Sequence, residues 1–311
     1  MRWATYGSTQ DGQDHAALIE AGKLRALPAG IHLIDLISGE GMPMEAAAVW
    51  ARTTPFEVID FSAAKLRSPI PEPPSMRDFL SFENHYVNTR TGLGLEVDPL
   101  FYEQPSFYFT NPAAVVDPVS EVTSAPGTEQ FDFELEVAAV IGRRGSDLTL
   151  DDAEDHIAGY TMFCDWSARD LQALETPFGT GPAKGKDTAT SVGPVLVTPD
   201  ELEPFRSGNG FDLEMKAFVN GKQYSAGNWN SVYWSMAQLL VFASRGTELR
   251  PGDVIGTGTV GTGSIMELAA VHGEDQYPWL VPGDEIKLQV QELGEMAGKV
   301  IPAHPTVPFK Q

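Results

Sequence analysis

The sequence predicts an α+β protein that is mostly β, in which a small N-terminal domain precedes a larger domain. Glycine (30 residues) and proline (23 residues) are abundant enough to favour a turn-rich β protein over a helical bundle. Strand-like segments also outnumber helix-like segments along the chain. A length of 311 residues fits one large domain or a large domain with a small one, and 42% hydrophobic residues suffice for a sizeable core.

Residues 1–70 are predicted to form the small domain, with both α and β elements. The segment 68–74 contains four prolines, which cannot lie inside a helix or a central strand, so we place the domain boundary there. The expected elements are strands at Arg2–Tyr6, Ala16–Glu20 and Phe56–Phe61 and a helix at Pro43–Ala51.

The larger domain, residues 75–311, is predicted to be mostly β. It begins with an amphipathic helix at Ser75–Asn88, and a loop-rich segment follows at 90–130. The later strands are expected at Phe131–Ile141, Tyr160–Cys164, Val192–Thr198, Asp212–Val219, Val254–Thr257 and Glu285–Leu293, and the later helices at Leu150–Ala158, Asp165–Leu174 and Ser235–Arg245.

The charge and the cysteine content restrict the partners and the compartment. A formal net charge of −22 repels phosphate groups, so we expect neither nucleic acid nor an anionic membrane surface as a partner. An anionic substrate would need basic residues concentrated at its site. The single cysteine, Cys164, allows no intramolecular disulfide, which fits a reducing cytoplasm. The N-terminus has no apolar run typical of a signal peptide, and no segment is long enough to span a membrane.

Glu134 and Glu136 are candidate metal ligands. On a strand, alternate residues share one face, and their Cα atoms lie about 6.8 Å apart at roughly 3.4 Å per residue, close enough for both carboxylates to reach one ion. A solvated face of an edge strand would explain them equally well. However, the same face continues with Ala138 and Val140. Two like charges that enter an apolar core need a cation or a proton, which favours a metal site.

Asp165 stands where an apolar strand is expected to lead into a helix. An N-cap is a sufficient role for this aspartate, and a surface ion pair with Arg169 is another. On a helix, Asp165, Arg169 and Gln172 would fall within an arc of roughly 60°. One helix face would then offer a carboxylate, a guanidinium and an amide together.

Asp78 and His85 would likewise share one face of the helix expected at Ser75–Asn88. Ser75-x-x-Asp78 has the pattern of a capping box, which requires no metal. A lone histidine on a helix is usually structural or exposed, but one that faces a site can act as a general base near neutral pH.

Two loops and one further acid complete the candidate residues. The loop Gly181–Asp187 is basic, and Lys186 or Lys184 could receive a carboxylate, although a solvated turn would explain it as well. The segment 256–263 contains G-x-G-x-x-G but lies late in the chain with no acidic strand end after it, which excludes a dinucleotide site. Such a loop can still offer N–H groups and hydroxyls to an anion. Glu267 by itself reads as an exposed or hydrogen-bonded acid.

Together these segments resemble the fumarylacetoacetate hydrolase superfamily over roughly residues 75–300. The motifs occur in the order of that family, and the segment Asp78–His85 is similar to the fumarylacetoacetase branch. The resemblance implies that the larger domain, which follows the small N-terminal domain in the sequence, is a mixed β-sandwich roll and usually dimeric. The matching motifs are Glu134-Leu135-Glu136, Asp165-Trp166-Ser167-Ala168-Arg169-Asp170, Gly185-Lys186-Asp187 and Gly256-Thr257-Gly258-Thr259.

The resemblance also implies roles for these residues. The metal would be Mg²⁺, Mn²⁺ or Ca²⁺, hard cations that suit ligation by oxygen alone. The metal ligands would be Glu134, Glu136 and Asp165, with Asp78 as a further ligand; the catalytic residues would be His85 as the base, Glu267 to orient it, and Lys186; the substrate-binding residues would be Arg169, Gln172 and Thr259.

The expected function is metal-dependent hydrolysis of a C–C bond in a β-diketo acid, such as an acylpyruvate or a fumarylacetoacetate-like compound. The partners would be this small anionic oxo acid and a second copy of the chain in a homodimer. One alternative keeps the site and changes the reaction to decarboxylation of an oxaloacetate-type acid or isomerisation of an unsaturated dioate. Another is a non-catalytic protein that binds a structural Ca²⁺. The presence of both His85 and Glu267 favours hydrolysis.

Overall fold

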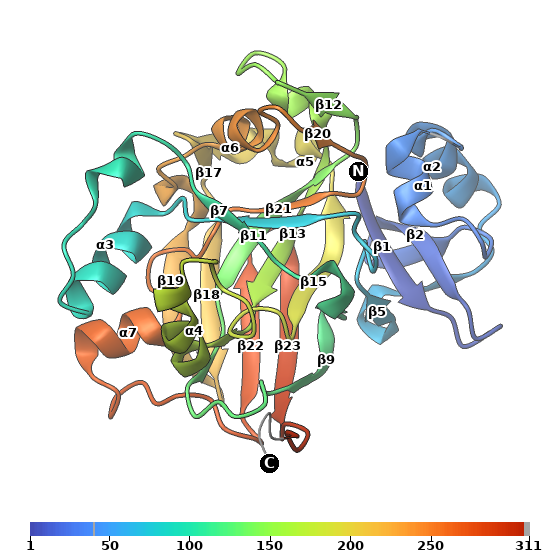
Figure 1. Cartoon of the computed structure of the whole chain (residues 1–311). Helices are drawn as coiled ribbons and strands as arrows, with labels where there is room; N and C mark the ends of the chain where they lie inside the picture. Colours follow the sequence, from blue (N-terminus) through green and yellow to red (C-terminus); the bar gives the residue numbers. More distant parts are fainter. Residues whose placement is uncertain (40, 308–311) are drawn as a thin grey trace.

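The computed structural model describes residues 1–39 and 41–307, and it confirms the α+β class. One mixed sheet of twelve strands crosses the molecule, and helices lie around it (Figure 1). Its main path, in spatial order, is β4 (Val58–Asp60), β3 (Lys23–Ala26), β2 (Asp14–Glu20), β1 (Arg2–Gly7), β15 (Thr190–Val197), β13 (Ile157–Asp165), β11 (Leu135–Ile141), β21 (Val254–Gly256), β6 (Met76–Phe79) and β7 (Phe107–Phe109); β5 (Lys65–Arg67) pairs with β1, and β8 (Val115–Val116) pairs with β15.

A second sheet of five strands packs against the first. Its order is β19 (Lys222–Asn228), β18 (Glu214–Val219), β22 (Glu285–Val290), β23 (Gly294–Ile301) and β9 (Val119–Thr123). Three strand pairs stand outside the two sheets: β10 (Phe131–Asp132) with β14 (Ser167–Ala168), β12 (Gly145–Ser146) with β20 (Glu248–Leu249), and β16 (Arg206–Ser207) with β17 (Gly210–Phe211).

Seven α-helices complete the described part of the chain. Figure 1 shows α1 and α2 beside the N-terminal strands and α3 and α7 on the opposite side of the molecule. The helices are α1 (Leu33–Ser38), α2 (Met44–Thr53), α3 (Glu83–Gly92), α4 (Arg169–Glu175), α5 (Pro199–Leu202), α6 (Met236–Ala243) and α7 (Ile265–His272).

The N-terminal strands belong to the same sheet as the rest of the molecule. β1 pairs antiparallel with β15, with Arg2 opposite Val197 and Trp3 opposite Leu196. Further along, β1 pairs with β2 and β5. The sheet therefore continues across the proline-rich segment, and the division at residue 70 stays a prediction.

The two faces of β11 contribute to different hydrophobic cores. Leu135, Val137 and Ala139 belong to the larger core, which also contains residues of β18, β22 and β23. Ala138 and Val140 belong to the other core, which includes the buried face of α2. Glu136 shares the parity of these two residues and is fully buried. The expectation that the glutamate face turns apolar is confirmed, and a solvated edge strand is excluded for Glu136.

The helix predicted at Ser75–Asn88 is wrong in its first half. Residues Met76–Phe79 form β6, which lies between β21 and β7, and α3 begins only at Glu83. All four residues of β6 are buried, and the ladder to β21 outweighs the helical spacing of the aromatic residues that follow. The capping box is also wrong, because Asp78 lies on a strand and the Ser75 hydroxyl donates to Asp253.

The helix predicted at Asp165–Leu174 begins four residues later than expected. β13 continues to Asp165, which pairs with Thr190 of β15, and α4 begins at Arg169. The shared helix face of Asp165 with Arg169 and Gln172 is therefore wrong, and so is the N-cap role. Because β13 pairs with β15 on one side and β11 on the other, the strand extends beyond the apolar run in its sequence.

Two smaller predictions also need correction. The helix expected at Leu150–Ala158 is only a 3₁₀ turn at Ala153–His156, because β13 already begins at Ile157. The strand expected at Phe131–Ile141 is interrupted at residues 133–134, and β10 pairs with β14 instead of continuing the ladder of β11.

Candidate metal and active site

Four buried carboxylates meet where the strands β6, β11 and β13 lie together. Asp78 lies on β6, Glu136 on β11 and Asp165 at the end of β13, while Glu134 directly precedes β11. Their exposed fractions are 5% or less. One oxygen each of Asp78, Glu134 and Asp165 lies within 4.8 Å of the others, which is close enough for one ion to bind all three.

The hydrogen bonds around this cluster leave carboxylate oxygens free. Asp78 Oδ1 and Asp165 Oδ1 are buried and have no hydrogen-bond partner among the described residues. Their Oδ2 atoms both contact the Tyr108 hydroxyl, at 3.0 Å for Asp78. A single hydroxyl proton can serve only one of the two carboxylates. The pair therefore needs either an additional proton or a cation.

Two buried cations compensate part of the negative charge. The Lys186 ammonium pairs with Glu134 and lies 3.0 Å from Asp165 Oδ2. The Arg169 guanidinium lies 2.8 Å from both Glu134 Oε1 and Asp132 Oδ2. With Asp132 included, five buried carboxylates face two buried cations, so the site retains an excess of negative charge.

The excess of buried negative charge changes the pKa values of the carboxylates. Burial raises the pKa of Asp78, and the charge of Asp165 raises it further. Burial also raises the pKa of Glu136, together with the charge of Asp78. Burial also raises the pKa of Glu134, but the nearby charges, chiefly those of Lys186 and Arg169, together outweigh it and keep this pKa below the usual range. Asp78 and Glu136 therefore hold protons more readily than ordinary carboxylates until a cation replaces them.

The glycine-rich loop after β21 holds Glu136. The backbone N–H of Gly258 donates to Glu136 Oε2 at 2.9 Å, and the Thr259 hydroxyl donates to Glu136 Oε1 at 3.2 Å. The donors that the sequence offered to an anionic ligand thus bind a carboxylate of the protein itself. Thr259 also lines the adjacent cavity, and its contact with substrate stays a prediction.

Gly256 lies directly against two of the carboxylates. A Cβ atom added there would stand 2.8 Å from Asp78 Oδ1 and 3.3 Å from Glu136 Oε2. Gly256→Ala should displace both carboxylates, lower stability by about 1–3 kcal/mol through overpacking and weaken divalent-cation binding. Urea unfolding and cation titration measure the two effects. Gly41→Ala is the control, since a Cβ there meets no described atom within 4 Å; wild-type cation affinity in Gly256→Ala would contradict the prediction.

His85 and Glu267 form a buried pair beside the cluster. His85 Nδ1 lies 2.8 Å from Glu267 Oε2, and Asn88 Nδ2 donates to Glu267 Oε1 at 2.8 Å. Because Nδ1 faces a carboxylate, it carries the ring proton, and Nε2 is the nitrogen left to accept one. Glu267 is in turn held at the start of α7, where its N–H donates to the Ser264 hydroxyl. The reading of Glu267 as an exposed acid is excluded.

A cavity of about 460 Å³ opens onto these groups. Gln172 lines it, and Gln172 Oε1 accepts from Arg169 Nη1 at 3.2 Å, which leaves the amide nitrogen free to donate. Lys186 also lines the cavity, whereas Lys184 is exposed and pairs with Asp187. Gly185 between the two lysines permits close packing, because a Cβ there would lie 2.8 Å from the backbone nitrogen of Gln172.

The structure brings most of the sequence-predicted site residues to this one cavity. Its lining includes eight of them, and Gly181 of the basic loop also lines it: Asp78, His85, Glu134, Glu136, Arg169, Gln172, Lys186 and Thr259. Asp165 and Glu267 lie behind it and contact Lys186 and His85 respectively. The assigned roles of these residues stay predictions.

Three residues that hold this arrangement were not predicted from the sequence. Asp132 accepts hydrogen bonds from Arg169 and from the N–H groups of Ile265 and Met266, which ties α4 to α7. Its spacing of two from Glu134 continues the acidic alternation and could have indicated it. Asn88 follows His85 by one helical turn. Tyr108 gave only a weak signal, as the centre of an aromatic triplet in a loop-rich segment.

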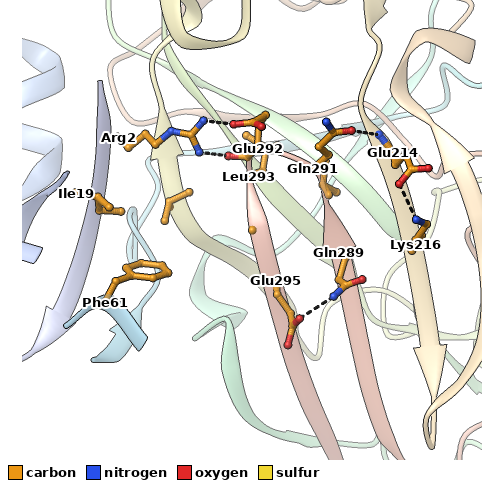
Figure 2. Close-up of a pocket in the computed structure, with 13 residues that line it drawn as sticks. Arg2, Ile19, Phe61, Glu214, Lys216, Gln289, Gln291, Glu292, Leu293 and Glu295 are labelled. Carbon is orange, nitrogen blue, oxygen red and sulfur yellow. Dashed lines mark hydrogen bonds and ion pairs between the residues drawn. The ribbon is translucent and has the colours of Figure 1, made fainter. Parts of the chain in front are cut away.

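A second cavity, of about 600 Å³, lies between the N-terminal strands and the five-stranded sheet (Figure 2). Its charged side chains already pair with each other: Arg2 with Glu292, and Lys216 with Glu214 at 2.6 Å. The first cavity, in contrast, combines a buried excess of charge with a histidine. We therefore place the candidate site there.

The carboxylate cluster fits a divalent cation. It supplies only oxygen donors, at least two of which are buried without a partner in the described part of the chain. Hard cations such as Mg²⁺, Mn²⁺ and Ca²⁺ prefer this donor set. Asp78, Glu134 and Asp165 would hold the ion, and Glu136 lies next to Asp78 as the further candidate ligand.

Across residues 1–39 and 41–307, each helix is too short or too polar to cross a lipid bilayer.

Comparisons with known proteins agree with the fold and the motifs. Oxaloacetate tautomerase YisK of Bacillus subtilis is 31% identical over 263 residues, which cover 81% of this chain and 80% of that protein. Fumarylacetoacetase of Oryza sativa subsp. japonica is 29% identical over 270 residues, 67% of this chain and 63% of that protein. The solved structure of a fumarylacetoacetate hydrolase from Exiguobacterium antarcticum superposes with a TM-score of 0.75 at 25% identity and covers 98% of this chain and 100% of its own.

The model of the C-terminal fumarylacetoacetate hydrolase domain matches residues 76–301, which include all the candidate site residues. The chain therefore belongs to the fumarylacetoacetate hydrolase family of enzymes.

Proposed function

We propose that this protein is a divalent-cation-dependent hydrolase that cleaves a C–C bond in a β-diketo acid, such as an acylpyruvate. The observation that carries the proposal is the buried His85–Glu267 pair, which opens onto the same cavity as the unsatisfied carboxylate cluster. A cation at the cluster would polarise the oxygens of a 2-oxo acid. The histidine supplies a base for water within the same cavity.

The residues of the chain divide the proton transfers between them. His85 Nε2 takes a proton from water, and Glu267 stabilises the imidazolium that forms. The hydroxide adds to the acyl carbonyl carbon, and the bond from this carbon to the neighbouring CH₂ breaks. The electron pair of this bond stays on the CH₂ carbon, so that the leaving fragment is an enolate. The enolate then takes the proton back from His85 Nε2. The free amide nitrogen of Gln172 and the ammonium of Lys186 would stabilise the enolate charge.

A second candidate reaction is tautomerisation of an oxaloacetate-type acid. It is supported by the 31% identity with an oxaloacetate tautomerase over most of both chains. In this reaction His85 Nε2 would move a proton to or from the carbon next to the 2-oxo group. No water attack is required, so the same pair of residues would act only as a proton shuttle.

The test compares the two reactions on one preparation. The protein is stripped with EDTA, reloaded with Mg²⁺ or Mn²⁺, and assayed for pyruvate release from an acylpyruvate and for enol-to-keto conversion of oxaloacetate. We expect pyruvate release only after reloading. Accelerated conversion of oxaloacetate without pyruvate release would replace hydrolysis by the second candidate. A cation-dependent rise in melting temperature without any turnover would instead indicate a non-catalytic metal-binding protein.

A further inference from the structure

Among the described residues that line the cavity, one cation has no carboxylate partner. Arg90, in the last turn of α3, lines it together with Arg169 and Lys186. Arg169 and Lys186 each pair with two carboxylates of the protein. Arg90 Nε donates to the carbonyl oxygen of Glu96 at 2.8 Å, but its two terminal nitrogens have no partner among the described residues. In a chain with 43 acidic side chains, an unpaired guanidinium at a cavity points to an anionic ligand.

The surroundings of Arg90 fix its position. The segment after α3 holds the arginine through Glu96, and the N–H of Asp98 donates to the Tyr86 hydroxyl at 3.1 Å. The neighbouring Thr89 hydroxyl lines the same cavity and is buried without a partner in the described part of the chain. Arg90 and Thr89 therefore both line the cavity with donor atoms that no described group occupies.

The distance between His85 and Arg90 indicates which part of a bound substrate would reach Arg90. His85 precedes Arg90 by five residues on α3, about 7.5 Å along the axis at roughly 1.5 Å per residue. The cation cluster lies on the His85 side and would take the 2-oxo acid group. A group bound by Arg90 is therefore at the other end of the substrate.

We propose that Arg90, assisted by Thr89, is a specificity-determining residue that binds a second carboxylate at the far end of the oxo acid. This inference rests on the proposed function and narrows its substrate class to dioic oxo acids. The two free terminal nitrogens of Arg90 match the two oxygens of a carboxylate in bidentate geometry, which a methyl-terminated acyl chain cannot use.

The test uses two substrates that differ only at that end, 2,4-dioxoheptanedioate and 2,4-dioxoheptanoate. We expect Arg90→Gln to lower kcat/KM for the dioate by about 10–100-fold, the effect of a lost charge-assisted hydrogen-bond pair, and to change that for the monoacid by less than threefold or so. Arg90→Lys should recover only part of the loss, because lysine lacks the planar fork. Arg52→Gln, at an exposed ion pair on α2, is the matched control and should alter neither value.

Calorimetric binding of both compounds to Mg²⁺-loaded His85→Gln protein, with and without Arg90→Gln, separates this inference from the proposed reaction. The wild-type protein could fail to turn over either compound and still bind the dioate more tightly in a way that depends on Arg90. That result would overturn the proposed reaction and support the role of Arg90 in specificity. An equal effect of Arg90→Gln on both compounds, or none on either, would overturn the role of Arg90.

Discussion

Asp165→Asn is expected to abolish divalent-cation binding. It should also reduce activity by more than roughly 10–100-fold, which is the usual loss when a residue that only supports a metal ligand is replaced. The substitution keeps the shape of the side chain but removes one of three charges that converge within 4.8 Å. It also removes the ion-pair partner that lies 3.0 Å from Lys186. Calorimetric titration with Mg²⁺ and Mn²⁺ measures the binding, and pyruvate release measures the activity.

The protein should still fold, because Asp165→Asn relieves repulsion among buried carboxylates. Burial raises the pKa of Asp165 in the native protein, so ionising it there without a cation costs stability. The metal-free melting temperature should therefore equal or exceed that of the wild type, while the increase caused by the cation disappears. Retention of that increase in Asp165→Asn would exclude Asp165 as a ligand.

Asp170→Asn is the matched control, because Asp170 belongs to the same sequence motif as Asp165. Asp170 accepts hydrogen bonds from the Thr128 hydroxyl at 2.6 Å and from the Glu129 N–H at 2.8 Å, and it lies outside the carboxylate cluster. This variant should bind the cation normally and lose on the order of 1 kcal/mol of stability through the weakened hydrogen bonds.

His85→Gln is expected to lower kcat by about 10²–10⁴-fold, the usual contribution of a general base, while cation affinity stays unchanged. Nε2 is the ring nitrogen available to accept a proton, and glutamine cannot replace it. Measuring kcat and the cation Kd on the same preparation separates loss of the base from loss of the metal site. Retention of more than about a tenth of the rate would remove His85 from the mechanism.

Glu267→Gln and His272→Gln complete this experiment. Glu267→Gln should lower kcat less than His85→Gln does, because the imidazolium that forms during the reaction loses its counter-charge. A purely structural role of Glu267 would lower the amount of folded enzyme without lowering kcat per folded molecule. His272 is exposed at the end of α7, so His272→Gln should leave kcat unchanged.

Local patterns predicted the elements whose own hydrophobic pattern agrees with the pairing or packing that they adopt. The strands at Arg2–Tyr6 and Val192–Thr198 and the helices at Pro43–Ala51 and Ser235–Arg245 lie within two residues of the observed bounds. The failures occur where pairing with distant strands decides. Met76–Phe79 leads into aromatic residues spaced as in a helix, yet its ladders to β21 and β7 make it a strand.

The same division applies to the site. The alternation of Glu134 and Glu136 and the apolar face beyond them are properties of one segment, so the sequence by itself predicted a buried acidic pair. A metal ion as the partner of this pair stays a prediction. The family motifs likewise determined the fold class. They could not indicate that Tyr108 bridges two carboxylates or that Asn88 holds Glu267, because each contact joins segments far apart in the chain.

Only the tertiary structure decided how Asp78, Asp165 and His85 meet. Two separate helices were expected, one that aligns Asp78 with His85 and another that begins at Asp165. Instead, Asp78 and Asp165 lie on strands that bring their carboxylates together across the sheet. Sequence spacing describes a side chain's position within its own element, whereas the register between strands sets the distances between elements. Burial by both cores then removes water from the carboxylates, and this desolvation would favour the binding of a cation.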